Sequence, residues 1–266
     1  MDNIRIAKET ISITKKKEYA VGDKTVKLPE VDPEEVIVIS PEDGARLLDT
    51  DISSYKQAKP CRIRVVNADS FQAGRMYENP LVMNFANAHN PGGGFLIGAT
   101  AQEEALCRCS TLYASITSKK AAEMYRYNNT HLSRVESDHM LISPNVVVFR
   151  DEHYEFIDPP VVLSVITLPA PNRYGAALLA SDKMIGETFI RRIRIMLLAA
   201  MKYGYKNLVL GAWGCGAFGN PPLKVADYFK EVIISRELGK CFDEICFAIY
   251  GKEDGENITA FRSVFE

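Results

Sequence analysis

The sequence has few of the features that mark membrane, secreted or nucleic-acid-binding proteins. No apolar run reaches the ~18 residues of a membrane-spanning helix, and no apolar core of a signal peptide follows Met1–Arg5. Lys and Arg number 32 against 34 Asp and Glu, which gives a net charge of −2 and no global basic field. We therefore expect no membrane partner and no sequence-specific nucleic-acid partner.

Cysteine and metal-binding patterns are also sparse. The six Cys form no regular framework, which suits a reducing compartment, so we expect a cytoplasmic protein, or a nuclear one in a eukaryotic source. No histidine stands at zinc-site spacing from the Cys residues, and Cys109 and Cys246 fall in apolar stripes typical of buried thiols. The sequence contains neither G-x-S-x-G nor G-x-x-x-x-G-K-[ST], so it lacks the signature of a nucleophile elbow or a P-loop. We expect neither a metal nor a cofactor.

The composition is that of an ordinary globular chain. It has 266 residues, of which 47% are hydrophobic and 25% charged, so it can bury a large core without disulfides or metals. From residue 61 onward, apolar runs typical of buried strands alternate with helical patterns, which predicts a sheet with helices on both faces. Residues 1–60 are polar and irregular. We expect them to form an N-terminal extension packed on a main domain that spans residues 61–266.

Local patterns predict the individual elements. Strands or hairpin strands are expected at 19–28, 36–39, 62–67, 81–86, 146–149, 161–168, 208–210 and 245–250. Helices are expected at 70–78, from Gln102 through Ile116 as one long helix, from Ile185 to a stop at Gly204, and after an Asn220 side-chain cap. Residues 41–49 fit a turn or a short helix, and 118–140 an exposed helix end and loop.

Two glycine-rich loops each follow a predicted buried strand and precede a helix. The first contains Gly92, Gly93 and Gly94, whose missing side chains let a ligand approach the backbone and whose amides can hold an anion or a ribose. A plain mobile turn is the alternative. The second runs from Gly211 to Asn220, where oriented amides and a helix N-terminus suit a diphosphate.

The second loop matches G-x-G-x-x-G at Gly214, Gly216 and Gly219, but its context does not fit a nicotinamide-binding domain. That fingerprint belongs near the start of its domain, with an acidic residue ~20 positions later at the end of the next strand. Here the loop lies near the C-terminus, and Asp243 and Glu244 precede the next strand. We therefore reject a nicotinamide-dinucleotide site in this loop and still expect the loop to bind a diphosphate.

Two carboxylates, Glu103 and Glu104, open the long helix seven residues after the first glycine loop. They can simply favour the positive helix end, and Glu104 is spaced for a surface ion pair with Arg108. Adjacent helix residues point about 100° apart, so the two cannot flank a bond from opposite faces as glycosidase pairs do. One carboxyl would act as acid and then as base. Desolvation and substrate phosphates would have to raise its pKa.

These motifs resemble the poly(ADP-ribose) glycohydrolases, and specifically the microbial type. The resemblance rests on Phe85-Ala86-Asn87, Gly92-Gly93-Gly94, and Gln102-Glu103-Glu104 after a seven-residue gap; it spans about residues 60–250. It implies a three-layer α/β/α macrodomain with a mixed sheet, hydrolysis of ribose–ribose bonds, and ADP-ribose and protein-attached poly(ADP-ribose) as partners of a monomer. Glu104 would be the catalytic acid, and Glu103 would orient the ribose.

The resemblance further implies substrate contacts in both loops. These would involve Asn87, Gly92, Gly93, Gly94, Gln102, Gly214, Cys215, Gly216, Ala217, Phe218 and Gly219. Asp69 occupies a place suited to an adenine-binding acid, although it also suits the N-cap of the next helix. His89 could line the cleft or have no chemical role. A non-catalytic ADP-ribose reader and a hydrolase of mono-ADP-ribosyl linkages remain alternatives, and exo versus endo cleavage is left open.

Overall fold

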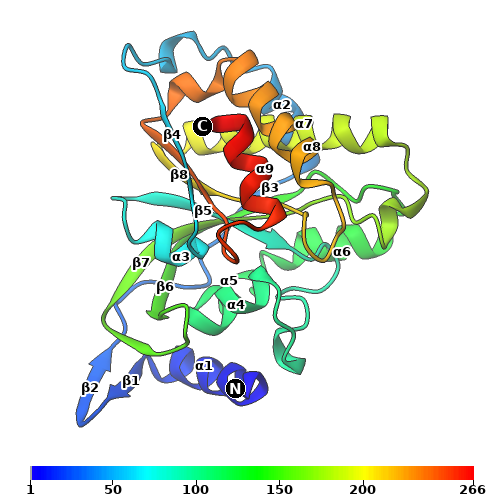
Figure 1. Ribbon diagram of the computed structural model, residues 1–266. Coiled ribbons are helices and arrows are strands. Elements are labelled where there is room, and N and C mark those ends of the chain that lie inside the picture. The colour runs from blue at the N-terminus through cyan, green and yellow to red at the C-terminus, as the bar shows by residue number, and fades with distance from the viewer. Residues whose placement is uncertain (1) are drawn as a thin grey trace.

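A seven-stranded mixed sheet forms the centre of the protein (Figure 1). The computed structural model describes residues 2–266. The sheet order is β3-β6-β7-β5-β8-β9-β4, with β6 antiparallel to β3 and β7 and every other pair parallel. The strands are β3 (Ile37–Ile39), β4 (Arg62–Val66), β5 (Pro80–Ala86), β6 (Met140–Arg150), β7 (Phe156–Pro169), β8 (Asn207–Leu210) and β9 (Glu244–Ala248). Every strand predicted from the apolar runs is therefore present.

Helices cover both faces of the sheet, which confirms the predicted three-layer α/β/α arrangement. Successive strand residues point to opposite faces, so Met83 packs in one core and Val82 in the other. One face is covered by α2 (Pro41–Leu48), α7 (Asp182–Lys202), α8 (Pro222–Lys230) and α9 (Glu256–Phe265). The other face carries α3 (Ser70–Gly74), α4 (Gln102–Cys109), α5 (Leu112–Ile116) and α6 (Ala122–Thr130).

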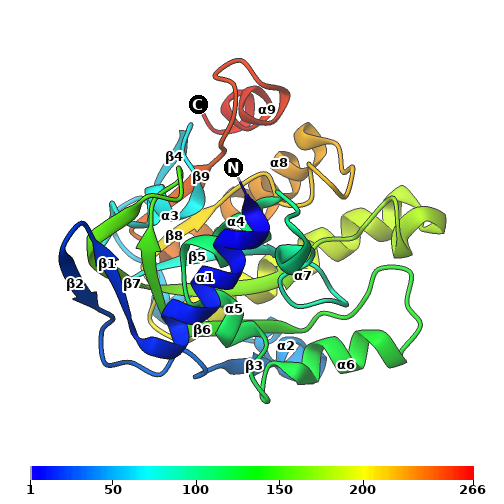
Figure 2. The ribbon, with the colours of Figure 1, turned by 90° about the horizontal axis from the view of Figure 1, so that it is seen from below.

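The first 60 residues are more regular than their polar sequence predicts. They begin with α1 (Asn3–Lys16), followed by the predicted hairpin of β1 (Glu18–Val21) and β2 (Lys24–Lys27). Helix α1 lies across α4 and α5 (Figure 2). Strand β3 forms the edge of the main sheet, and α2 packs on α7. Two elements of this segment, β3 and α2, thus belong to the layers of the main sheet. The domain boundary at residue 60 stays a prediction.

The predicted long helix after Gln102 is wrong, since the chain forms two helices. Helix α4 ends at Cys109, and Ser110 takes an extended conformation that makes a bridge to Val148 of β6. The Thr111 amide donates to the Val147 carbonyl, and the Val147 amide donates back to Thr111 Oγ1. A long-range pairing therefore interrupts a helical pattern that continues in the sequence.

The last helices begin and end near the expected residues, with one correction. Helix α7 ends two residues before Gly204, as predicted. The predicted side-chain cap of α8 is wrong: Pro221 occupies the cap position, and the buried Asn220 donates Nδ2 to the carbonyls of Pro171 and Gly214. Within residues 2–266, no helix combines the length and apolar character needed to cross a bilayer.

Candidate active site

A pocket of about 550 Å³ opens at the edge of the sheet where the parallel strands end. A residue that closely follows each of these strands lines it: Asp69 after β4, Asn87 after β5, Ala170 after β7, Ala212 after β8 and Tyr250 after β9. Carboxyl ends of parallel strands meet at one edge, where α/β proteins place their ligand crevices. The pocket brings together the acid pair of α4 and the second glycine loop, although they lie more than 100 residues apart.

Glu103 is fixed on both of its carboxylate oxygens. Oε1 accepts from Asn84 Nδ2 at 3.2 Å, and Oε2 accepts from the Asn87 amide at 2.9 Å. Its side chain is almost fully buried, and this burial raises its pKa to about 8 against the opposing effect of the two hydrogen bonds. The nearby Glu104 carboxylate adds to the rise. At neutral pH, Glu103 therefore holds its proton.

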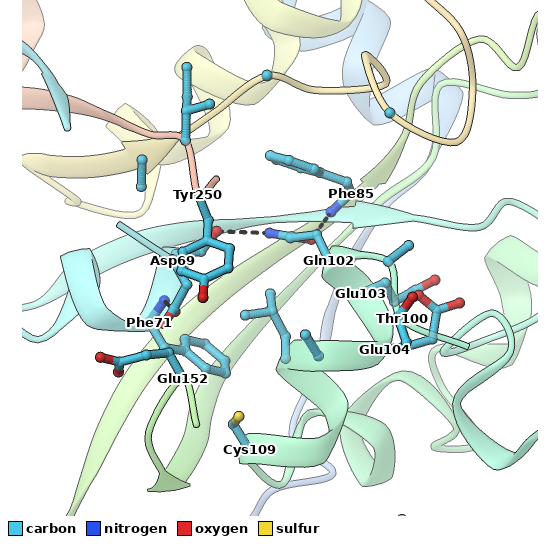
Figure 3. A pocket seen from close by; sticks show the side chains of 18 of the residues that line it. Asp69, Phe71, Phe85, Thr100, Gln102, Glu103, Glu104, Cys109, Glu152 and Tyr250 are labelled. Atoms are coloured by element: carbon cyan, nitrogen blue, oxygen red, sulfur yellow. Dashed lines mark hydrogen bonds between the residues drawn. The ribbon is translucent and has the colours of Figure 1, made fainter. Parts of the chain in front are cut away.

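Glu104 is held by one oxygen only. Oε1 accepts from the Gly94 amide at 2.8 Å, whereas Oε2 is buried and has no partner within residues 2–266. The residue is 7% exposed and lines the pocket (Figure 3). The alternative of a surface ion pair is wrong, because Arg108 is also buried and donates Nε to the Tyr154 hydroxyl. One oxygen of this pocket-lining carboxyl is thus left without the hydrogen-bond partner that buried polar atoms usually have.

The first glycine loop braces the two carboxylates. Gly93 has φ +55°, and a Cβ there would collide with Oε1 of Glu104. Two hydrogen bonds close the turn: the Gly93 amide donates to the Asn90 carbonyl, and the Phe95 amide donates to the Gly92 carbonyl. None of Gly92, Gly93 and Gly94 belongs to the pocket lining, so their predicted contact with the ribose stays a prediction. The group that this loop holds is the side chain of Glu104, through the Gly94 amide.

Gln102 and Asn87 also line the pocket, and each is tied to the protein. Gln102 Nε2 donates to Ser70 Oγ and the Met83 carbonyl, while its Oε1 accepts from the Phe85 amide. These bonds fix the start of α4 against the end of β5. Asn87 Oδ1 accepts from the amides of His89 and Asn90, which leaves the Nδ2 donor without a partner in the described part of the chain.

In the second glycine loop, the amides divide into two groups. Cys215 and Gly219 donate within the loop, to the carbonyls of Ala212 and Gly216. The amides of Gly214, Gly216, Ala217 and Phe218 have no acceptor among residues 2–266, and all four residues line the pocket. Four pocket-lining residues with free N–H groups suit a diphosphate, which accepts several hydrogen bonds at once.

Buried side chains hold this loop in shape. Trp213 is fully buried, donates Nε1 to the Leu168 carbonyl and meets Phe189 edge to face. Gly214 has φ +74°, and a Cβ there would press on Ala170 and Asn220. These contacts fix the shape of the loop.

The other end of the pocket carries Asp69, Phe71, Glu152 and Tyr250 (Figure 3). Asp69 caps α3, since Oδ1 accepts from the amides of Phe71 and Gln72. Both readings of Asp69 remain compatible, because it caps the helix and also lines the pocket. Burial raises its pKa above the ordinary value. Its contact with adenine stays a prediction.

Sequence reasoning assigned no role to Asn84, Thr100 and Tyr250, and it overrated His89. Asn84, which orients Glu103, was visible as a polar residue within an otherwise apolar strand. Tyr250 lines the pocket from the loop after β9, and Thr100 lines it from the loop before α4. His89 is not part of the lining, and its Nδ1 lies 2.9 Å from Asn129 Oδ1.

The comparisons agree with this geometry. Residues 7–151 match the family model described as "Microbial-type PARG, catalytic domain". The structure is similar to that of poly(ADP-ribose) glycohydrolase from Thermomonospora curvata, with a TM-score of 0.91 and 33% identity over 99% of each chain. The same enzyme bound to the inhibitor ADP-HPD gives 0.86 and 32% over 98% of each chain.

A second organism gives the same picture. The Deinococcus radiodurans glycohydrolase in complex with ADP-ribose has a TM-score of 0.81 and 33% identity, over 90% of this chain and 98% of the other. A search among curated proteins found no match. The family match covers more than half of the chain and the structural likeness nearly all of it. The chain therefore belongs to the microbial-type poly(ADP-ribose) glycohydrolases, and it is a glycohydrolase that hydrolyses poly(ADP-ribose).

Proposed function

We propose that Glu104 alone serves as acid and then as base in this hydrolysis. The observation that carries the proposal is that Glu104 lines the pocket with Oε1 held by the Gly94 amide and with a buried Oε2 that has no partner within residues 2–266. A hydrogen-bonded carboxyl with one free oxygen is oriented for proton transfer at a single position. Glu103 is bonded on both oxygens and is placed to orient the sugar rather than to react.

The reaction proceeds in two proton transfers. Glu104 gives its proton to the oxygen that links the terminal ribose to the next unit, and the bond from the anomeric carbon to that oxygen breaks. The remaining ribose carries oxocarbenium character. A water then attacks the anomeric carbon and transfers a proton to Glu104, which restores the starting carboxyl. The products are ADP-ribose and a polymer one unit shorter.

The reacting carboxyl of Glu104 has a protonated neighbour. Burial keeps Glu103 protonated at neutral pH, with a pKa of about 8, beside a second carboxyl at Glu104. Two adjacent carboxyls can offer both an acid and a base, as dyads do in other hydrolases. The predicted rise in pKa thus lies on the neighbour of the reacting group.

The substrate would lie along the pocket between its two ends. The free amides of Gly214, Gly216, Ala217 and Phe218 would hold the diphosphate, and the adenine would extend toward Asp69 and Tyr250. The terminal ribose would then face Glu103 and Glu104. ADP-ribose bound to the Deinococcus radiodurans enzyme and ADP-HPD bound to the Thermomonospora curvata enzyme support binding in this family.

We further propose that the polymer is attached to proteins, and that the chain acts as a monomer in the cytoplasm, with a macrodomain-type fold.

A non-catalytic reader would need both loops but no unpartnered acid in the pocket. A mono-ADP-ribosyl hydrolase would differ only in the leaving group, which lies outside these motifs. Polymer and mono-modified substrates tested side by side separate these activities.

The test is Glu104→Gln, which keeps the shape of the side chain and its acceptor for the Gly94 amide. We expect polymer hydrolysis to fall by at least about 10³-fold, because general acid–base catalysis is lost, while ADP-ribose affinity in calorimetry changes less than about threefold. Glu78→Gln on the surface is the matched control and should retain full activity. Native-rate hydrolysis by Glu104→Gln would refute the assignment.

A further inference from the structure

The exposed face of α1 carries a basic stripe formed by Arg5, Lys8, Lys15 and Lys16. At 100° per residue, these four side chains fall within an arc of about 100° on the helix surface. The opposite face of the helix is buried against the domain through Ile6, Thr10 and other residues. The stripe spans about 16 Å, from a rise of 1.5 Å per residue.

The charges of the stripe are not neutralised locally. Within residues 2–266, no carboxylate lies within 4.0 Å of these four side chains. Glu9, the acid in the middle of the helix, borders the stripe, but its carboxylate pairs with the buried Arg150 at 2.7 Å. The chain as a whole has a net charge of −2, so this local surplus of cations is a feature of the surface and not of the composition.

The stripe begins beside the catalytic end of the pocket. Asn3 Nδ2 donates to the Gly98 carbonyl, and Gly98 lies two residues before Thr100, which lines the pocket next to the acid pair. In Figure 2, α1 runs across the front of the molecule from this loop toward the hairpin. Leu96 and Ile97 at the tip of the same loop are 51% and 80% exposed. An apolar tip thus joins the pocket rim to the basic stripe.

We propose that the α1 stripe and the Leu96–Ile97 tip bind the body of poly(ADP-ribose) beyond the bond that is cut. This inference rests on the proposed placement of the terminal unit. If that unit fills the pocket with its ribose at Glu104, the next unit must leave at the rim formed by the loop before α4. The apolar tip offers a surface for a base, and the stripe offers cations to the diphosphates of the following units. The surface would favour long chains over short ones.

The experiment compares two triple variants that remove the same number of lysine charges. The stripe variant is Lys8→Gln, Lys15→Gln and Lys16→Gln; the control is Lys59→Gln, Lys202→Gln and Lys230→Gln, at exposed positions elsewhere. Glutamine retains helix propensity, and circular dichroism checks that α1 remains folded. KM and kcat are measured on a long polymer and on a chain of two ADP-ribose units, at several salt concentrations.

We expect the stripe variant to raise KM for the long polymer by about tenfold at low salt, with kcat unchanged. The slope of log KM against log salt should fall by about 2, since each lost contact with a flexible polyanion removes about 0.7. The two-unit chain and ADP-ribose affinity should show no change, and the control should match the unmodified protein on both substrates.

Two results would overturn the inference and leave the proposed function intact. One is an unchanged KM and salt slope of the stripe variant on the long polymer. The other is loss of binding to phosphatidylserine-containing vesicles with unchanged polymer kinetics, which would make α1 a lipid-binding face. Failure of the unmodified protein to cleave either substrate would instead refute the function itself.

Discussion

Replacing Glu103 by Gln should change how the stability of the protein depends on pH. Glu103 is almost fully buried, and its two oxygens accept from Asn84 and the Asn87 amide. Gln has the shape of the protonated side chain but cannot ionise. The neighbouring Asn84 has an unpartnered Oδ1, which can accept from the new amide after a flip. The variant should therefore fold like the protonated form of the unmodified protein.

The magnitude follows from the pKa of Glu103, which burial raises from 4.5 to about 8. Between these values the folded chain keeps a proton that the unfolded chain has released. Because the folded state binds more protons, the free energy of unfolding falls as pH rises through this window. The full difference corresponds to about 5 kcal/mol above pH 8, and about 3 kcal/mol of it is lost between pH 5 and pH 8.

Urea unfolding at pH 5, 6, 7, 8 and 9 measures this dependence directly. The free energy of unfolding of the unmodified protein should fall relative to that of Glu103→Gln by about 3 kcal/mol from pH 5 to pH 8. Other titrating groups are common to both proteins, so they cancel in the difference. A difference that stays constant over the range would show that Glu103 ionises normally, and the account of the acid pair would fail.

Four further variants test the parts that hold the site. Gly93→Ala should lower kcat more than tenfold and stability by about 1–2 kcal/mol, since its φ is positive and its Cβ meets Glu104. Gly214→Ala should weaken ADP-ribose binding more than tenfold in calorimetry, whereas Gly216→Ala, with open space around its Cβ, should not. Arg150→Met should lower the free energy of unfolding by about 2 kcal/mol, because α1 loses bonds to this guanidinium; a change below about 0.5 kcal/mol would contradict that role.

Much of the fold could be predicted from the sequence because most elements follow from local residue patterns. The apolar run at 81–86 predicts a central strand, and the two glycine loops follow buried strands as expected. Helix α1 was missed because its buried stripe includes Ala7 and Thr10, which do not mark an apolar face. The helix after Gln102 is interrupted at Ser110 because this residue pairs with Val148, and no local pattern predicts a contact between residues so far apart in the sequence.

The site shows the same division. The residue types at Glu103, Glu104 and the second loop predict an acid pair and an anion cradle, and the pocket brings them together. Their individual tasks depend on hydrogen bonds that spacing cannot fix. Only the structure shows that the Gly94 amide holds Glu104 and that Asn84 holds Glu103. Asn220 likewise has the residue type and position of a helix N-cap, but its buried side chain donates a hydrogen bond to the Gly214 carbonyl and so stabilises the loop.

A crystal structure of the Glu104→Gln variant soaked with ADP-ribose tests the central claim most directly. We predict that the diphosphate accepts hydrogen bonds from the amides of Gly214, Gly216, Ala217 and Phe218. The substituted side chain should then lie about 3 Å from the hydroxyl on the anomeric carbon of the terminal ribose. A nucleotide bound elsewhere, or a terminal sugar out of reach of residue 104, would contradict the account.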